Sequence, residues 1–144
     1  MVSYKRAEAT IGHVGIEVTD LGRSKKFYKT LFGGLGLKTI MDSKDGLGLS
    51  NDCFSVWIGE LQEPRVRRKA PTGDEFVVAD HLAILVDDKG AVYEIEKEMK
   101  KNGFEAFFPC EEHPQFEPGY FAVSFTDPDN YVIEVYTRQK QNRS

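Results

Sequence analysis

The sequence Asp127-Pro128-Asp129-Asn130-Tyr131-Val132-Ile133-Glu134-Val135-Tyr136 predicts a turn followed by a strand, and the strand carries a carboxylate that the fold must accommodate. Asp-Pro begins a tight turn, and the Val, Ile and Tyr residues that follow favour a strand. Because strand side chains alternate between the two faces of a sheet, Glu134 shares a face with Val132 and Tyr136. The opposite face is apolar as well. A sheltered carboxylate needs a cation or several hydrogen-bond donors, so Glu134 predicts a binding site.

Two other segments with the alternation of a strand carry a histidine near their start. In residues 11–18, apolar side chains alternate with polar ones, and His13 shares the polar face with Gly15 and Glu17. A second segment, residues 81–86, begins with His81. The two histidines are candidate metal ligands, and Glu17 is a candidate catalytic base or a solvated ion-pair partner.

An internal repeat relates these two segments. Laying His81 on His13 also places Ile84 on Ile16 and Asp88 on Asp20 without a gap. After each segment the same order of elements follows, namely a helix and three strands. The helices are predicted over 20–33 and 90–102, and the strands over 37–41, 46–49, 54–58, 104–109, 120–126 and 131–137. Two βαβββ modules are the economical explanation, and they predict an α+β fold of eight strands that forms a half-closed cup.

The domain boundaries follow from the repeat. A chain of 144 residues suits one domain with a sizeable core. We place the first module at residues 10–60, a linker at 61–79 and the second module at 80–138. The linker contains a basic run, residues 65–69, flanked by prolines, and we interpret this run as a solvated loop.

Composition excludes several classes of function. The net charge of −4 gives no electrostatic reason to expect a nucleic-acid partner. Residues 1–10 lack the apolar core of a signal peptide, and no later apolar run approaches a membrane span, so we expect a soluble cytoplasmic protein with no membrane partner. Cys53 and Cys110 lack the spacing of a zinc knuckle or a redox pair, and we interpret them as ordinary thiols.

Taken together and in order, these motifs resemble the vicinal oxygen chelate superfamily. This superfamily includes glyoxalase I, extradiol dioxygenases, fosfomycin-resistance enzymes, methylmalonyl-CoA epimerase and bleomycin-resistance proteins. The resemblance covers about residues 10–138 and rests on Gly12-His13-Val14, Asp20-Leu21, Phe27-Tyr28, Asp80-His81-Leu82-Ala83, Phe125-Thr126-Asp127-Pro128-Asp129-Asn130 and Glu134. Asn130 replaces the usual glycine of the turn, and either residue tolerates a left-handed backbone.

The resemblance implies that His13, His81 and Glu134 bind one divalent metal ion. Two imidazoles and a carboxylate suit Fe, Ni, Zn, Mn or Co without distinguishing them, and they leave positions open for a substrate. The implied function is a metal-dependent enzyme whose small-molecule substrate is chelated through vicinal oxygens, with lyase or isomerase chemistry first. A ring-cleaving dioxygenase and a non-catalytic, bleomycin-resistance-like protein that binds an aromatic ligand are the alternatives. A homodimer is expected, and the sequence leaves open whether the site forms within one chain or between two.

The sequence departs from particular members of this superfamily. Trp57 stands where glyoxalase I has a metal-binding glutamate, and Trp cannot act as a ligand or a base. Ser124 occupies the place of the catalytic tyrosine of the extradiol dioxygenases, ten positions before Glu134. Residues 114–119 contain no Lys or Arg, which argues against the fosfomycin-resistance activity.

The remaining candidates would line a substrate pocket. Trp57 and Tyr136 face the cup by alternation, and with Tyr120 and Ser124 they would form its walls, although they would equally serve as core residues. His113 lies in an irregular segment, residues 111–119, of the kind that borders sites. It is a candidate acid or base alongside Glu134 and Glu17, although loop histidines are usually solvated.

Overall fold

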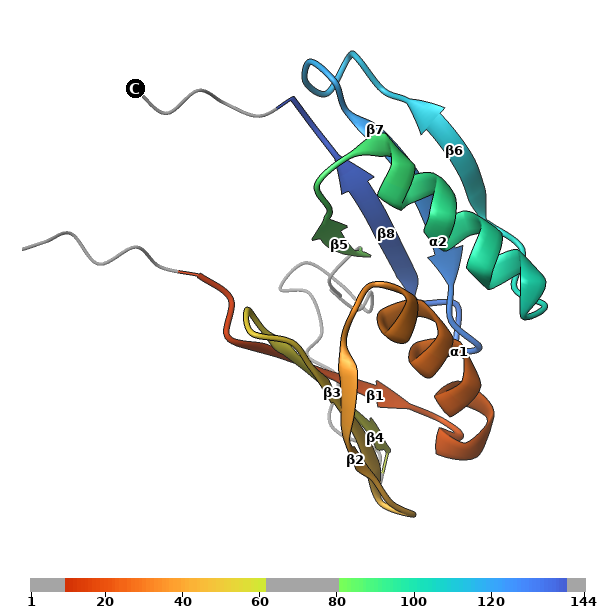
Figure 1. Ribbon diagram of the computed structural model, residues 1–144. Helices are drawn as coiled ribbons and strands as arrows, with labels where there is room; N and C mark the ends of the chain where they lie inside the picture. Colours follow the sequence, from red (N-terminus) through yellow and green to blue (C-terminus); the bar gives the residue numbers. More distant parts are fainter. Residues whose placement is uncertain (1–9, 62–80, 140–144) are drawn as a thin grey trace, which may run out of the picture.

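The computed structural model describes residues 10–61 and 81–139 of the chain. The elements of these residues are β1 (His13–Val18), α1 (Leu21–Gly34), β2 (Lys38–Asp42), β3 (Gly46–Ser50), β4 (Ser55–Glu60), β5 (His81–Leu85), α2 (Lys89–Lys101), β6 (Phe108–Glu112), β7 (Phe121–Thr126) and β8 (Val132–Thr137). The two βαβββ modules and the α+β class are therefore confirmed (Figure 1). Most of the predicted linker, 62–79, and Asp80 lie outside the described residues.

The eight strands form two separate four-stranded sheets with the same topology. The strand orders are β1-β4-β3-β2 and β5-β8-β7-β6. In each sheet the first strand pairs in parallel with the last strand of its module, and the other pairs are antiparallel. Within residues 10–61 and 81–139, no strand of one sheet is hydrogen-bonded to a strand of the other.

Helix capping fixes where α1 and α2 begin. The Asp20 carboxylate accepts a hydrogen bond from the Arg23 amide at 2.9 Å, and Asp88 accepts one from the Ala91 amide at the same distance. Each cap satisfies a backbone donor that has no partner inside its helix. After α2, Gly103 adopts a φ of 90°, which provides the left-handed turn that ends the helix.

The core lies between the two helices and the inner faces of both sheets. Figure 1 shows α1 and α2 next to each other, with the first sheet beside α1 and the second behind α2. Phe27 of α1 meets Phe104 edge to face, with ring centroids 5.4 Å apart. Gly34 lies so close to Ile95 of α2 that an added Cβ would lie 2.6 Å from its Cδ1 atom. The helices therefore join the modules.

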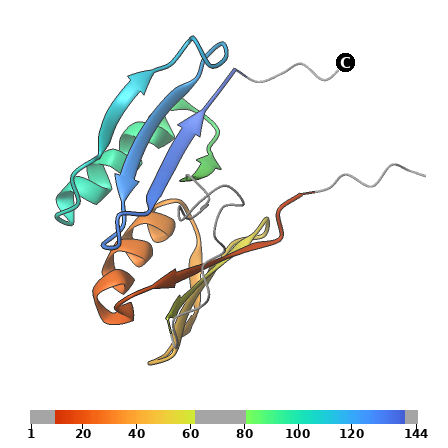
Figure 2. The same ribbon diagram turned by 180° about the vertical axis from the view of Figure 1, so that it is seen from behind.

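Each sheet consequently has a second face, which we call its open face. Figure 2 shows β6, β7 and β8 in front of α2, and no described helix or strand covers their near side. On the first sheet, the side chains of His13, Glu17 and Trp57 belong to this face and are exposed. The two open faces are the surfaces on which the predicted cup residues lie.

The turn at 127–130 connects the modules by polar contacts. Asn130 has a φ of 65°, the left-handed conformation that the sequence predicts for it. The Asp129 carboxylate accepts hydrogen bonds from the amide and the hydroxyl of Thr19, at 3.0 and 2.5 Å. This turn therefore positions the start of β8 relative to the end of β1.

One predicted strand is misplaced. The sequence pattern places it at 104–109, whereas β6 spans Phe108–Glu112. Its ladder with β7 is irregular between Phe108 and Glu111, and it carries Pro109, which an edge strand tolerates because one side of it needs no ladder hydrogen bond. The apolar run of 104–108 misled the prediction because Phe104 and Ala106 pack against the core from a loop.

Neither described helix combines the length and apolar character that a passage through a membrane requires.

Candidate metal centre

Glu134 lies on the open face of β8 and is largely sheltered. Its neighbours in sequence, Ile133 and Val135, are fully buried in the core, whereas Val132 and Tyr136 are half-buried on the open side. The alternation predicted from the sequence is therefore confirmed. The Glu134 side chain is only 13% exposed, so its charge depends on nearby donors or cations.

His81 lies beside the Glu134 carboxylate. Strands β5 and β8 run in parallel, with Ala83 opposite Glu134, so that His81 and Glu134 lie on the same open face. The Nε2 atom of His81 lies 3.2 Å from the Oε2 atom of Glu134. An imidazole nitrogen and a carboxylate oxygen at this separation, facing a cavity, match the donors that a divalent transition metal prefers.

Tyr120 contacts the other oxygen of the carboxylate. Its phenol donates a hydrogen bond to Oε1 of Glu134. Burial and this hydrogen bond to the carboxylate raise the pKa of Tyr120 above its ordinary value, so the phenol remains a donor at neutral pH. The Tyr120 ring stacks on Tyr136, with centroids 4.8 Å apart and planes at 21°.

A cavity of about 490 Å³ opens above His81, Tyr120 and Glu134, and it is large enough for a small molecule. Its walls are His81, Phe107, Phe108, His113, Phe116, Tyr120, Ala122, Ser124, Val132 and Glu134. Phe107, Phe108 and Phe116, which we call the aromatic rim, are 54%, 59% and 65% exposed. The cavity therefore combines a polar floor with an apolar entrance.

His113 belongs to this cavity wall, in the segment that the sequence identified as a site border. Its ring stacks on Phe116, with centroids 5.3 Å apart, and meets Tyr120 nearly edge to face. Its Nδ1 atom lies 3.4 Å from the Nε2 atom of Gln115. The His113 amide donates to the Tyr120 carbonyl at 2.9 Å, which closes the loop beside the cavity.

Ser124 lies on the floor of the same cavity. It is opposite Glu134 in the β7–β8 ladder and is almost completely buried. Four of the candidate residues on the second module, namely His81, His113, Tyr120 and Ser124, thus lie around Glu134 in one cavity.

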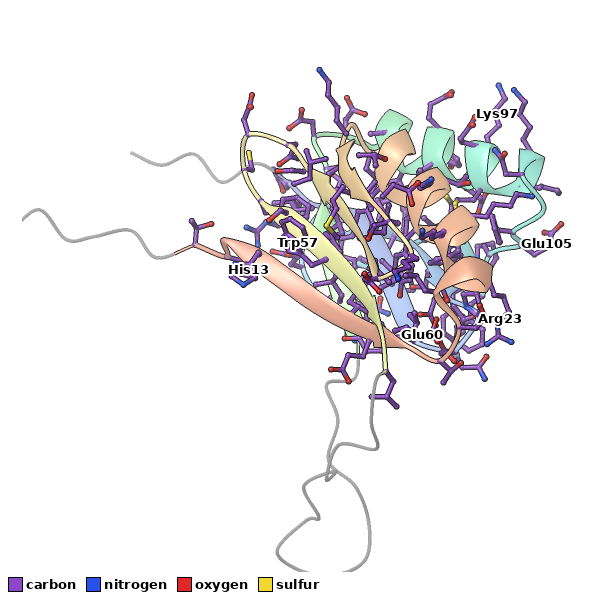
Figure 3. The ribbon with its side chains drawn as sticks, turned by 90° about the horizontal axis from the view of Figure 1, so that it is seen from below. His13, Arg23, Trp57, Glu60, Lys97 and Glu105 are labelled. Atoms are coloured by element: carbon purple, nitrogen blue, oxygen red, sulfur yellow. The ribbon has the colours of Figure 1, made fainter. Side chains whose placement is uncertain are left out.

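His13, Glu17 and Trp57 lie on the other sheet. His13 is not part of the cavity wall, and Figure 3 shows it with Trp57 toward one end of the first sheet. Among residues 10–61 and 81–139, no three His, Cys, Asp or Glu side chains come together in a way that would hold a metal ion. One chain therefore brings together two of the three expected ligands, His81 and Glu134.

The register of the first sheet shows which position Trp57 occupies. Gly15 is opposite Trp57, as Ala83 is opposite Glu134, so the indole occupies the position of the carboxylate in the other module. The ring lies over Gly48, where an added Cβ would lie 2.7 Å from the ring. Glu60, the carboxylate at the end of the same strand, accepts a hydrogen bond from the Leu21 amide at 3.1 Å and lies toward the other end of the sheet (Figure 3).

The aromatic rim is the part of the site that the sequence did not identify. Phe107 and Phe108 fall in the misplaced strand, and Phe116 falls in the irregular segment 111–119, where the sequence indicates only His113 as a candidate. The available signal was the Phe107-Phe108-Pro109 sequence, because two large apolar residues before a proline seldom belong to a central strand.

Comparisons with known proteins agree with this architecture. The chain is 25% identical to the uncharacterized protein YqjT of Bacillus subtilis over 124 residues, which are 85% of this chain and 94% of the relative. A lactoylglutathione lyase from Agrobacterium tumefaciens has a similar structure, with a TM-score of 0.66, 19% identity, and coverage of 92% of this chain and 96% of that chain. A putative glyoxalase from Bacillus halodurans gives a TM-score of 0.68, 22% identity, and coverage of 90% and 96%. At these identities the structures show the fold alone.

The match to a protein family covers most of the chain. Residues 10–135 match the Glyoxalase/Bleomycin resistance protein/Dioxygenase superfamily, and this range includes the first module and nearly all of the second, with His13, His81 and Glu134. Members of this superfamily typically bind a metal ion and small-molecule substrates. The chain therefore belongs to the Glyoxalase/Bleomycin resistance protein/Dioxygenase superfamily.

Proposed function

We propose that the protein is a metal-dependent enzyme that acts on a small substrate with two neighbouring oxygens, by lyase or isomerase chemistry. The observation that carries this proposal is the pair formed by His81 Nε2 and Glu134 Oε2, 3.2 Å apart on the floor of a cavity. Both donors suit a divalent metal, and the cavity leaves room for a substrate beside them.

The third ligand in this proposal is His13 of a second copy of the chain. Within one chain His13 lies on the open face of the first sheet, whereas His81 and Glu134 lie on that of the second. Both open faces carry large exposed apolar side chains, among them Trp57 and Phe108. A symmetric homodimer that pairs each first module with the partner's second module would cover these faces and form two equal sites.

The residues of the chain would then have distinct tasks. A divalent metal ion supplies Lewis acidity and orients two substrate oxygens when it is bound. Tyr120 and His81 hold the Glu134 carboxylate from its two sides. His113 lies on the cavity wall, and its imidazole is the acid or base that we propose. Glu17 would enter with His13 from the second copy as a further candidate base.

Two observations favour a second candidate function, a protein that binds an aromatic ligand without catalysis. Trp57 replaces a carboxylate by an indole, and the aromatic rim offers three exposed rings to a planar ligand. A ring-cleaving dioxygenase is favoured less, because Ser124 presents only a short hydroxyl group at the position where that subgroup has a tyrosine.

Elemental analysis of the purified protein separates these functions. We expect one metal ion per chain in the wild type and loss of the metal in His81→Ala. His113→Ala is the matched control, because it removes a histidine from the same cavity wall and leaves the ligand set intact. A metal-free wild type that binds aromatic ligands would support the non-catalytic function and contradict the proposed enzyme.

A further inference from the structure

We infer that Tyr120 is a positioning residue that holds Glu134 so that the carboxylate binds a metal through Oε2 alone. This inference rests on the proposed metal site. In the role that we assign to it, Tyr120 contacts neither the metal ion nor the substrate. The starting observation is that the two oxygens of Glu134 have different partners. Oε1 accepts the hydrogen bond from the Tyr120 phenol, while Oε2 faces His81 Nε2 at 3.2 Å.

The phenol is able to position the carboxylate because its own ring is held on two sides. One side stacks on Tyr136, with centroids 4.8 Å apart. Phe116 meets the ring at 83°, with centroids 5.3 Å apart. The backbone is fixed as well, since the Tyr120 amide donates to the Glu117 carbonyl at 3.2 Å and the Tyr120 carbonyl accepts from the His113 amide at 2.9 Å.

The residue before Tyr120 fixes the direction in which the chain enters β7. Gly119 has a φ of 74°, which a side chain would strain, and an added Cβ would lie 2.8 Å from the Gln139 amide nitrogen. The Gln139 amide in turn donates to the Pro118 carbonyl at 3.0 Å. The position of the phenol is therefore set by the fold and not by the carboxylate that it contacts.

Removing the phenol hydroxyl would release one side of the carboxylate. Glu134 would then be free to rotate about its terminal torsion and present either oxygen, or both, to a metal ion. A hydrogen bond of this kind orients a ligand before the metal arrives, and losing it typically weakens metal affinity by about 10- to 100-fold. A residue that served only to fill the cavity wall would not change the coordination.

Tyr120→Phe tests the inference, because it deletes the hydroxyl and keeps the ring. Tyr136→Phe is the matched control, since it deletes a hydroxyl from the other ring of the same stack. Each variant is titrated with Co(II), and the dissociation constant and the visible absorption spectrum of the bound ion are recorded. We expect Tyr120→Phe to bind Co(II) about 10- to 100-fold more weakly, with an altered spectrum, and Tyr136→Phe to match the wild type.

Three other outcomes would contradict the inference, and they are distinguishable. Wild-type affinity and spectrum in Tyr120→Phe would leave the metal site intact and exclude the positioning role. Thermal unfolding of Tyr120→Phe well below that of Tyr136→Phe, with an unchanged Co(II) spectrum, would assign the phenol to the stability of the fold. A wild type that binds no Co(II) would instead refute the proposed metal site, and this inference with it.

Discussion

The phenol of Tyr28 donates a hydrogen bond to Oδ2 of Asp127 at 2.6 Å, although the two residues belong to different modules. Tyr28 lies in the middle of α1, and Asp127 begins the turn that leads into β8. Both side chains are buried, and Oδ1 of Asp127 accepts the amides of Asp129 and Tyr131 at 2.9 and 2.8 Å. The turn before Glu134 is therefore built around a buried carboxylate that the first module completes.

Deleting this hydroxyl should destabilise the protein. In Tyr28→Phe the buried Oδ2 of Asp127 would lose its donor, and leaving such a group unsatisfied costs about 1–3 kcal/mol. Urea unfolding would measure this loss as a lower transition midpoint with an unchanged slope. Tyr93→Phe is the control, because Tyr93 is 53% exposed, and it should unfold like the wild type. Equal stability of both variants would show that the buried contact contributes nothing.

The contact between Asp129 and Thr19 should make stability depend on acid pH. Burial acts to raise the pKa of Asp129, but the two Thr19 donors and the Arg23 guanidinium outweigh it and hold this pKa below its usual range. Since the folded-state pKa is lower than the unfolded one, the stabilisation is complete above about pH 4 and is lost as the pH falls through the folded-state pKa.

Asp129→Ala measures this contribution. At pH 7 we expect the variant to be less stable than the wild type by about 1–2 kcal/mol, because it lacks two hydrogen bonds to a charged group. As the pH falls below 4, the difference between the two proteins should shrink. Chemical unfolding at a series of pH values would check this, and a difference that stays constant down to the acid limit would contradict the assignment.

The position of the Trp57 ring should require a glycine at residue 48. A Cβ at Gly48 would lie 2.7 and 2.9 Å from Cζ3 and Cε3 of the indole, so Gly48→Ala must displace the ring. We expect a shift in tryptophan fluorescence, which reports this ring directly because Trp57 is the single tryptophan of the chain.

Gly59→Ala provides the control for that substitution. Gly59 lies on the same strand as Trp57, and an added Cβ there would meet no atom within 4 Å. Its fluorescence should equal that of the wild type. An unchanged spectrum in Gly48→Ala would mean that the indole does not rest on the sheet.

The sequence predicts the local architecture of this protein well because that architecture is set by short patterns. The repeat that aligns His81 with His13 reappears in the register, where Gly15 faces Trp57 and Ala83 faces Glu134. The alternation around Glu134 is confirmed for the same reason, since it depends on neighbours in the chain.

Features that depend on tertiary contacts could be predicted less well from the sequence. Phe104 looks like a strand residue but packs on Phe27 of the other module, which displaced the predicted β6. The modules pack through α1 and α2, and each module keeps its own sheet. His13 and Glu134 therefore lie on different sheets. No local pattern reports how two modules pack, so the separation of His13 from the cavity could not be predicted.

In the proposed dimer, His13 of one chain joins His81 and Glu134 of the other around one metal ion. A heterodimer of His13→Ala and His81→Ala, isolated with two different affinity tags, tests it directly. One of its two sites then lacks both histidines, whereas the other is intact. We predict one metal ion per heterodimer and none in either mutant homodimer. A heterodimer without metal, while the wild type binds metal, would contradict the shared site.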